Sequence, residues 1–403
     1  MRLQVVRPGL LTTLQDGGRR GYESLGITIG GVLDDFAAAM ANRLVGNGPD
    51  AAVLEMTLSG PALLVTEGGL LGLAGADMDA RINGRPWSPG AAARVFSDDR
   101  ITFALARRGL RAYLAAVGGF VGERWLESRS TDLLLGRGGI NGRPVAAGDT
   151  LEAPDGCQGP LRLATRAAIA PPGPLRLLAA DEGGTVVGRL SGDIFRVAPK
   201  SDRVGLRLSE RLDEHVARQA LERGAAGGTG LSEGMAMGSV EVTPGGEVII
   251  LLKARGTVGG YFVPAHVIRA DWPRLAQLRP GDAVRMELVS RAEADRAARR
   301  LQARRDAAMV VSSGCVAVSA IAPPDGGTLG PTVPRGVAVH AGERLTTIRR
   351  GDESVDILAP HDGVVAWSGR EGSVVSGADP VLWVVDQEDG DPEPAGTTEG
   401  GGR

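Results

Sequence analysis

Lysine is almost missing from this sequence of 403 residues, since only Lys200 and Lys253 among its 45 basic residues are lysines. No lysine follows Lys253. Biotinylation, lipoylation and Schiff-base formation all require a lysine amine, so the last third of the chain can support none of them.

Cysteine, histidine and aromatic residues are also scarce. Two cysteines exclude a disulfide framework and a cysteine-rich zinc site, and the four histidines never fall in a metal-binding spacing, so we expect no metal. A net charge of −3 and an aromatic share of 3% argue against nucleic-acid binding. No run approaches 18 apolar residues and the N-terminus lacks a signal-peptide pattern, so we expect a soluble, cytoplasmic protein without a membrane partner.

Glycine and hydrophobic residues are abundant by contrast, with 61 glycines and 43% hydrophobic residues. Short runs rich in valine, isoleucine and leucine alternate with glycine turns, a pattern typical of strands. Helical spacing predicts helices over 33–46 and 209–224. The sequence therefore predicts a mainly β fold with some helices, closer to barrels than to a parallel sheet.

The chain is long enough for two or three domains. A proline-rich seam separates two stretches that each contain a Gly-Asp turn, at Gly148–Asp149 and Gly281–Asp282. The sequence Ser290-Arg-Ala-Glu293 predicts a capping box that opens a surface helix. We expect the following organisation: a first half at 1–165, a second half at 166–309, a separate unit at 310–387 and a disordered tail at 388–403.

The first 290 residues or so contain ordered blocks that point to one family. They include GLLTTLQDGGRRGYESLGITIGGVLDDFAAAMANRLVGNGPDAAVLEMTLSGP (9–61), GRGGINGRPVAAGD (136–149), SDRVGLRL (201–208), SEGMAMGSVEVTPGG (232–246) and GTVGGYFVPAHVI (256–268). This series resembles the biotin-dependent carboxyltransferase family, also called the allophanate hydrolase subunit 2 family or the family of the 5-oxoprolinase C subunit. The resemblance implies two cyclophilin-like β-barrel halves and ATP acting through a complex. It also implies a related small subunit, similar to the 5-oxoprolinase B subunit or allophanate hydrolase subunit 1, and a third catalytic subunit or a biotin carboxylase.

Residues 310–387 resemble a biotinyl- or lipoyl-carrier domain, a small β-hairpin sandwich. Counting back from the Ala-Pro-His-Asp-Gly turn at 359–363 places Asp352 where the carrier lysine would stand. We therefore predict that this unit carries neither biotin nor lipoate and serves for docking. An intact mass without either added group is the expected measurement.

Several polar residues of the first half are candidates for function. Gln15, Asp16, Arg19 and Tyr22 lie in a glycine-rich turn, where Asp16 and Arg19 suit either a carboxylate or phosphate clamp or a structural turn. Glu55 lies in an otherwise apolar strand, and such a carboxylate usually has a partner or a function. Asp34 is interpreted as a helix cap and Asn47 as a turn residue, while Gly138 and Gly139 offer backbone N–H donors or form a tight turn.

The second half contains a similar set. Ser201, Asp202, Arg203 and Arg207 crowd one strand and suit either an anion-binding edge or surface ion pairs. Asp16, Arg19, Glu55, Asp202 and Arg203 are the predicted catalytic residues. The predicted substrate-binding residues are Gln15, Tyr22, Gly138, Gly139, Ser201, Arg207, Glu233, Arg255, Thr257 and Tyr261. We expect Asp202 and Arg203 on a pocket wall, with Gln15, Asp16 and Arg19 at a corresponding pocket, and Arg203→Ala to reduce affinity or turnover more than stability.

This chain departs from the family in two loops. A family run of the type Asp-Arg-Gln-Thr-Thr-Gly-Gly-Tyr reads Ala-Arg-Gly-Thr-Val-Gly-Gly-Tyr at 254–261, and a family Ser-Gly-Ala-Met-Asp reads Gly-Gly-Val-Leu-Asp at 30–34. Three interpretations stay open. The first is a subunit that opens the ring of 5-oxoproline or transfers a carboxyl group to a urea-like amide. The others are a non-catalytic regulatory subunit, of the type that antagonises a kinase inhibitor, and an enzyme with a changed small-molecule substrate.

Overall fold

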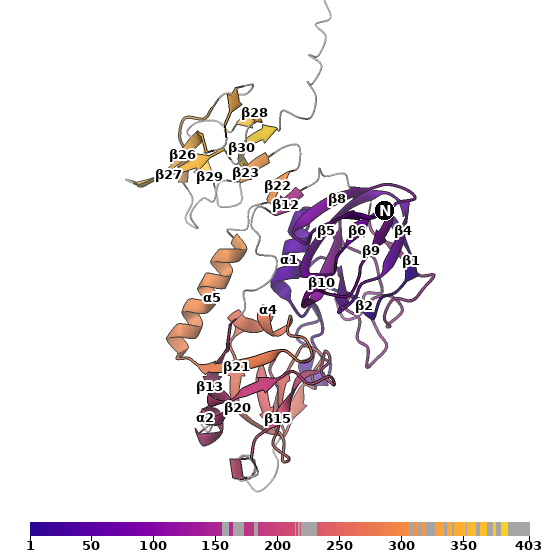
Figure 1. Ribbon diagram of the computed structural model, residues 1–403, viewed down its shortest axis with the longest axis vertical. Helices are drawn as coiled ribbons and strands as arrows, with labels where there is room; N and C mark the ends of the chain where they lie inside the picture. The colour runs from indigo at the N-terminus through magenta and orange to yellow at the C-terminus, as the bar shows by residue number, and fades with distance from the viewer. Residues whose placement is uncertain are drawn as a thin grey trace, which may run out of the picture. The chain divides into compact units, whose positions relative to one another are not determined.

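The computed structural model divides the chain into two compact units, Met1–Ala308 and Met309–Arg403. It describes residues 1–154, 161–163, 173–180, 184–213, 215–216, 218, 232–306, 310–312, 316–319, 327–333, 337–340, 342–351, 353–359, 363–368, 374–375 and 380–385. Strands dominate both units (Figure 1). The predicted mainly β class is therefore confirmed, with barrel-like sheets and a few helices.

The first half of Met1–Ala308 consists of two sheets and one long helix. Its elements are β1 (Arg2–Arg7), β2 (Leu11–Gln15), η1 (Glu23–Leu25), α1 (Asp35–Leu44), β3 (Val53–Thr57), β4 (Ala62–Glu67), β5 (Gly69–Asp77), β6 (Arg81–Ile82), β7 (Arg85–Pro86), β8 (Ala91–Val95), β9 (Arg100–Thr102), β10 (Arg108–Ala116), β11 (Thr150–Glu152) and β12 (Leu161–Leu163). One sheet has the order β11-β1-β4-β9-β6-β7, and the other contains β2-β3-β10-β5-β8-β12.

The packing of this half follows from its burial pattern. In β1 the odd-numbered residues Leu3 and Val5 face the core while their neighbours are exposed, whereas β5 and β10 are buried on both faces. Helix α1 covers the second face of β5 and β10 and packs on it through Phe36 and Met40 among others (Figure 1). Burying apolar side chains on both sides of one sheet makes the centre of this half rigid.

The second half centres on one sheet with the order β14-β21-β13-β20-β17-β18-β15 and has a short β16-β19 ladder beside it. Its elements are β13 (Leu175–Ala179), α2 (Gly184–Gly192), β14 (Ile194–Arg196), β15 (Gly205–Arg211), β16 (Glu233–Gly234), β17 (Ser239–Val242), β18 (Glu247–Leu251), β19 (Val258–Gly259), β20 (Phe262–Val267), η2 (Arg269–Asp271), α4 (Trp272–Leu275), β21 (Ala283–Leu288) and α5 (Arg291–Asp306). Its core is a separate apolar cluster that includes Phe195 and Ile250.

Two of the predicted helices are confirmed, and the start of a third is wrong. Helix α1 begins after Asp34, whose side chain accepts the Ala37 N–H, and it is followed by Gly46 at φ 76°. Helix α5 follows the predicted capping box. The predicted helix over 209–224 is wrong at its start, because β15 extends to Arg211 and pairs with β18. The alternation of apolar and polar residues before it has the period of a strand, and most of 212–224 lies outside the described residues.

The two predicted Gly-Asp turns have the same hydrogen bonds. Gly148 N–H donates to Val5 O, and Val5 N–H donates to Asp149 O, at 2.8 Å each. In the second half, Gly281 N–H donates to Val197 O at 2.8 Å, and Val197 N–H donates to Asp282 O at 3.0 Å. Both glycines have a φ of 90°, which favours glycine. The two halves therefore repeat one local architecture.

The unit Met309–Arg403 contains two four-stranded sheets, with the orders β23-β30-β28-β25 and β27-β26-β24-β29. Its strands are β22 (Val310–Ser312), β23 (Val316–Ser319), β24 (Gly327–Leu329), β25 (Ala338–Val339), β26 (Arg344–Arg350), β27 (Glu353–Leu358), β28 (Gly363–Ser368), β29 (Val374–Val375) and β30 (Pro380–Val385). Strands β26 and β27 form an antiparallel hairpin in which Arg350 pairs with Glu353. Asp352, which the sequence places at the carrier-lysine position, and the tail 388–403 lie outside the described residues.

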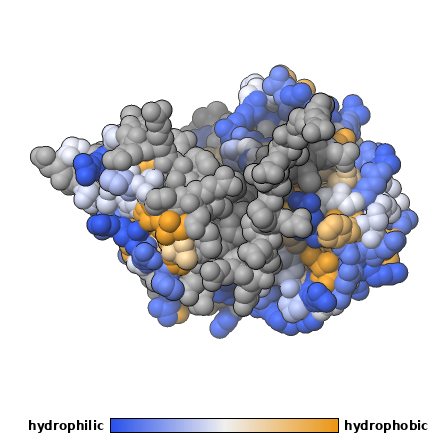
Figure 2. Space-filling view, turned by 90° about the horizontal axis from the view of Figure 1, so that it is seen from above, coloured by the Kyte–Doolittle hydropathy of each residue, from blue (hydrophilic) through white to orange (hydrophobic). Residues whose placement is uncertain are grey.

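The surface seen in Figure 2 is largely hydrophilic where residues are described, with a few small hydrophobic patches. Among the described residues, no helix is both long and apolar enough to cross a membrane.

Candidate functional site

The loop between β2 and α1, called here the β2–α1 loop, touches both halves of Met1–Ala308. The two ends of the loop are joined by a hydrogen bond of 3.0 Å from Val32 N to Asp16 O. From the second half, Arg203 Nη2 donates to Gly31 O at 2.7 Å, and Lys253 O accepts the Gly30 N–H at 3.4 Å. Arg203 of the second half therefore meets the loop that carries Asp16 and Arg19.

Asp16 holds the β2–α1 loop against the connection between β10 and β11. Its Oδ1 accepts hydrogen bonds from Gly18 N at 2.8 Å, Ser128 Oγ at 2.5 Å and Ser130 Oγ at 2.6 Å. Its Oδ2 accepts the Arg129 N–H at 2.5 Å. Four donors on one carboxylate fix its position. Asp16 thus positions the loop, as the structural-turn interpretation predicts.

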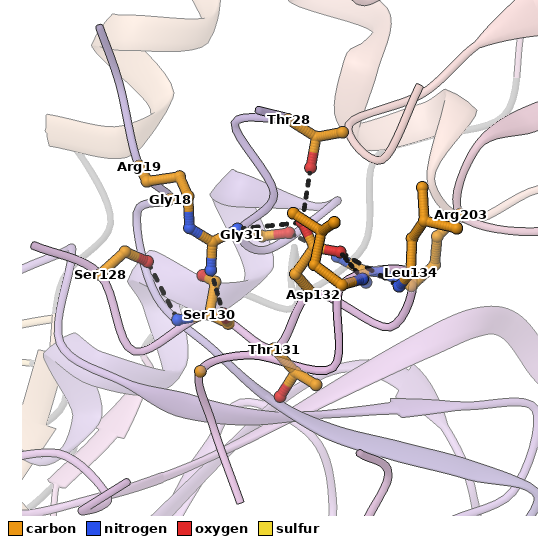
Figure 3. A network of polar contacts seen from close by, with 12 residues as sticks. Gly18, Arg19, Thr28, Gly31, Ser128, Ser130, Thr131, Asp132, Leu134 and Arg203 are labelled. Carbon is orange, nitrogen blue, oxygen red and sulfur yellow. Dashed lines mark hydrogen bonds and ion pairs between the residues drawn. The ribbon is translucent and has the colours of Figure 1, made fainter. Parts of the chain in front are cut away.

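Arg19 is a buried cation whose donors are not all used. Only 1% of the residue is exposed, and its Nη2 donates to Ser130 O while Nη1 lies 3.6 Å from Asp132 (Figure 3). Its guanidinium lies over the Trp125 ring, 4.8 Å from the centroid. Burial lowers the pKa of Arg19, although Asp132 and Asp16 oppose the shift. Among the described residues, Nε and Nη1 find no hydrogen-bond acceptor.

Gln15 and two glycines complete the surroundings of Arg19. Gln15 is buried and donates to Thr13 Oγ1 at 3.0 Å and to Thr131 O at 3.2 Å, whereas its Oε1 has no donor within the described part of the chain. Gly138 and Gly139 have φ values of 73° and 62°. A Cβ on Gly138 would collide with Ser130 O and come within 3.3 Å of Arg19 Nη2. The backbone must therefore approach the guanidinium closely here.

Gly139→Ala is expected to destabilise the protein more than Gly136→Ala does. Both glycines have φ values near 60°, but a Cβ on Gly139 would collide with Thr131 Oγ1, whereas a Cβ on Gly136 would meet nothing within 4 Å. Backbone strain alone costs about 1–2 kcal/mol, and the collision adds about 1–3 kcal/mol at position 139. Chemical denaturation of the two variants measures the difference, and equal losses would contradict the close packing.

A buried ion pair next to the β2–α1 loop joins the two halves. Glu55 on β3 pairs with Arg203 of the second half, and the two residues are 1% and 6% exposed. Glu55 Oε2 also accepts hydrogen bonds from Leu33 N and Tyr113 Oη, both at 2.8 Å. Burial lowers the pKa of Arg203 to about 10. Glu55 has the partner that its apolar surroundings predict.

Asp34 links the same network to the connection before β21. Its Oδ1 accepts the Ala37 N–H at 2.9 Å, and its Oδ2 accepts a hydrogen bond from Gln277 Nε2 at 2.7 Å. Complete burial raises the pKa of Asp34 to about 7, although both donors favour the carboxylate. Gln277 Oε1 in turn accepts the backbone N–H groups of Leu110 and Arg111. The interpretation of Asp34 as a helix cap is confirmed, and the contact with Gln277 adds to it.

In the second half, a pocket of about 430 Å³ lies beside the loop GTVGG, residues 256–260. Its lining includes Val204, Met235, Glu241, Gly256, Gly260 and Tyr261. Burial raises the pKa of Glu241. Arg255 points away to Met235 O, at 2.8 Å, and Thr257 O accepts the Met235 N–H at 2.9 Å. Of the predicted residues, Tyr261 lines this pocket, Arg255 and Thr257 support its wall, and Glu233 pairs with Gly259 in the β16-β19 ladder.

Four other predicted residues contact groups near them in the sequence or on an adjacent strand and do not join this pocket or the network around Glu55. Asp202 Oδ1 accepts the N–H groups of Val204 and Gly205, and Ser201 Oγ accepts the N–H of Arg207. Arg207 forms a half-exposed pair with Glu247 at 3.4 Å. Tyr22 is the half-buried residue before η1. The prediction that Asp202 and Arg203 share a pocket wall is corrected, because Asp202 caps its own turn while Arg203 extends inward to Glu55.

Several residues of the site are absent from the predicted set. They are Arg111, Tyr113, Ser128, Ser130, Asp132 and Gln277. Gln277 lies in the block LAQLRPGD, but nothing in its local pattern indicates a partner 166 residues away. His266, which lies on β20, is 3.2 Å from Ser239 Oγ and is not part of the network. Within the described residues, no group of three or more His, Cys, Asp or Glu side chains is arranged to hold a metal ion.

These features define a mainly β protein with a polar site shared by two repeated halves of one unit. The family described as carboxyltransferase domain, subdomain A and B, matches residues 25–288. The chain belongs to this family, as its sequence blocks predict.

Curated relatives and solved structures agree with this assignment. The 5-oxoprolinase C subunit of Escherichia coli is 32% identical over 316 residues, which cover 75% of this chain and 94% of that protein. The urea amidolyase of Lachancea kluyveri is 29% identical over 76% of this chain, which spans only 18% of that longer protein. The crystal structure of the K. lactis urea amidolyase matches with a TM-score of 0.67 at 24% identity, over 76% of this chain and 20% of that one. This last likeness concerns the fold.

Proposed function

We propose that Met1–Ala308 is a carboxyltransferase-family subunit that binds a small carboxylate- or amide-containing substrate at the β2–α1 loop. The observation that carries the proposal is the guanidinium of Arg19, buried beside Gly138, whose Nε and Nη1 find no hydrogen-bond acceptor among the described residues. A guanidinium in a dry site binds an anionic oxygen strongly, because water competes little there. The same donors would stabilise the negative charge that develops when an amide carbonyl is attacked.

Opening of the 5-oxoproline ring is the activity that we favour. The relative named as the C subunit of 5-oxoprolinase matches this chain over 94% of its length, whereas the urea amidolyase is matched over less than a fifth. Hydrolysis of a ring amide produces a carboxylate and an amine, and its intermediate is an oxyanion. ATP would enter through the complex, and carboxyl transfer to a urea-like amide is the second version of this proposal.

A heteromeric assembly is part of the proposal. We expect a related small subunit, of the type of the 5-oxoprolinase B subunit, and a third catalytic subunit in the cytoplasm, or a biotin carboxylase in the carboxyl-transfer version. Leu133, Leu134 and Leu135 support a protein contact, since Leu134 is 87% exposed on the loop that Asp132 fixes through the N–H groups of Leu134 and Leu135. Exposed apolar residues in a fixed loop are typical of interaction sites.

A non-catalytic binding subunit is the second candidate function. The observation that favours it is the engagement of Asp16 and Glu55, because every oxygen of these two carboxylates already has a hydrogen-bond or ion-pair partner. A general base needs a lone pair directed at the substrate. The unit Met309–Arg403 agrees with either function, and we propose that it is an unmodified biotinyl- or lipoyl-like docking domain after two cyclophilin-like halves.

Co-expression with the neighbouring subunit genes tests the function. Purified complex is assayed for ATP-dependent turnover of 5-oxoproline and of urea, with Arg19→Lys beside the wild type. Lysine keeps the charge but loses the paired donors, so we expect turnover of 5-oxoproline to fall by at least tenfold while the complex still forms. A complex that assembles and turns over neither substrate would favour the binding subunit.

A further inference from the structure

The pocket beside the loop GTVGG is bounded by one face of the second-half sheet. The two residues next to Glu241 in β17 belong to the apolar core of this half, so Glu241 faces the opposite side of the sheet. Its cross-strand neighbour on β18 is Ile249, which forms a separate apolar cluster with Met235 and Leu251 on that side. The fold therefore places a carboxylate among apolar side chains.

Glu241 is a buried carboxylate without a partner. Only 7% of the residue is exposed, and it lines the pocket. Within the part of the chain that the structure describes, its oxygens accept no hydrogen bond and form no ion pair. Arg207 and Glu241 both pair with Ile249, but two strand spacings, about 10 Å, separate their backbones, and Arg207 pairs with Glu247 at 3.4 Å instead. Removing a carboxylate from water without a donor is unfavourable, so Glu241 is suited to a donor supplied from outside the chain.

The loop on the other side of the pocket leaves space next to this carboxylate. A Cβ on Gly259 would lie 3.1 Å from Glu241 Oε1, closer than an ordinary contact, so glycine keeps this space open. Tyr261 and Val258 also line the pocket and are exposed, whereas Met235 is buried. The pocket thus has a buried charged group and is accessible from solvent.

The lining selects the class of ligand. A lone carboxylate attracts a cation, but a metal ion requires several ligands, and no cluster of His, Cys, Asp or Glu suited to one occurs among the described side chains. Apolar side chains and glycines favour a hydrocarbon group, and a volume of about 430 Å³ is typical of a small-molecule site. An organic ammonium ion combines both properties, and its three N–H donors match a carboxylate.

We propose that this pocket binds a small primary ammonium ion with a short aliphatic chain, whose charged nitrogen is held by Glu241. The proposal goes beyond the proposed function, because it assigns a ligand of the opposite charge to a different set of residues. Contact between an ammonium group and a carboxylate shielded from water is strong, since both charges assist the hydrogen bond and little water competes with it.

The scarcity of tyrosine permits a direct test on the full chain. Three tyrosines are present, and Tyr261 lines the pocket whereas Tyr22 and Tyr113 do not. Protein labelled with ring-¹³C tyrosine is titrated with n-butylammonium, n-butanol and butyrate, which share a short alkyl chain and differ in charge, and Tyr261→Phe identifies the signal of Tyr261. We expect n-butylammonium to shift this signal at a concentration about tenfold or more below that of the other two compounds. The signals of Tyr22 and Tyr113 should not respond.

Glu241→Gln is the decisive variant. Glutamine keeps the shape and loses the charge, so we expect the affinity for n-butylammonium to fall by about tenfold or more. Thermal unfolding should show a midpoint equal to or above that of the wild type, because the substitution removes an unpaired buried charge and no internal contact. Glu287→Gln is the matched control, since Glu287 is exposed on β21, and this variant should bind like the wild type.

Two results would overturn the proposal. One is a Tyr261 signal that n-butylammonium leaves unchanged or that butyrate shifts at the same concentration. The other is a folded Glu241→Gln variant that binds n-butylammonium like the wild type. Arg19→Lys should bind n-butylammonium like the wild type, so a failure of the proposed function leaves this test unaffected.

Discussion

Arg203→Ala is expected to lower the free energy of unfolding by about 3–5 kcal/mol. The substitution removes the nearer of the two cations that face Glu55, so a carboxylate that is 1% exposed keeps the donors Leu33 N and Tyr113 Oη and the more distant Arg111, at 3.9 Å. The carbonyl of Gly31 loses its donor at the same time. Urea denaturation of the wild type and the variant near neutral pH measures the loss. This expectation replaces the prediction from sequence that affinity would suffer more than stability.

Arg207→Ala is the matched control for this prediction. Arg207 and Glu247 are 3.4 Å apart, but their side chains are 39% and 34% exposed, so we expect a loss below about 1 kcal/mol. Replacing both Arg203 and Glu55 with methionine should recover part of the stability, since the closely paired charges are removed together, although the buried Arg111 loses its carboxylate partner at 3.9 Å. An Arg203→Ala variant as stable as the Arg207→Ala variant would show that the cross-half pair is unimportant.

The stability of the protein is expected to fall as pH rises from about 4 to about 7, because of Asp34. Its pKa is about 7 in the folded state, against an ordinary value of 3.8, so the unfolded chain releases this proton first. The folded state is then the more protonated one, and raising the pH across this window disfavours it. The difference between a pKa of 3.8 and one of about 7 corresponds to about 4 kcal/mol of stability, which is lost progressively up to pH 7 and not further above it.

Asp34→Asn isolates this contribution. Asparagine does not titrate, so the variant should lack the decline between pH 4 and 7 that the wild type shows in urea denaturation. Its amide also faces Gln277 Nε2, so a loss of stability that is independent of pH is expected as well. Asp35→Asn serves as the comparison, since this carboxylate is only one of the smaller causes of the raised pKa of Asp34, and its removal should shift the decline slightly to lower pH without abolishing it. A wild-type profile that is flat from pH 4 to 7 would contradict the prediction.

The fold class was predictable because its signals are local. Glycine turns, the alternation of apolar residues in β1 and the cap of α1 each occupy a few consecutive residues, and local geometry determines them. The exception at 209–211 shows the limit of this approach. Those residues follow the start of β15 and extend it through pairing with β18, which overrides the helical spacing that begins there.

Individual residues of the site could be predicted from the sequence, but not which of them contact one another. Glu55 and Arg203 are both conspicuous in the sequence, but their separation of 148 residues hides the fact that they form one pair. Gln277 and Tyr113 have no conspicuous neighbours, since an amide or a phenol is a common residue in many settings. Gln277 is important because it contacts the other half, and Tyr113 because it donates to Glu55 within its own half. No periodicity in the chain encodes either contact.

The contact of Gln277 with three backbone groups of the first half has a consequence for dividing the gene. Gln277 accepts the N–H groups of Leu110 and Arg111 and donates to Arg111 O, so a second-half side chain completes the hydrogen bonding at the start of β10. A chain severed between the halves would leave these backbone groups without their partner and would remove Arg203 from Glu55. Fission of this gene into two separately translated proteins is therefore disfavoured unless the fragments bind each other as they fold, even though each half has its own hydrophobic core.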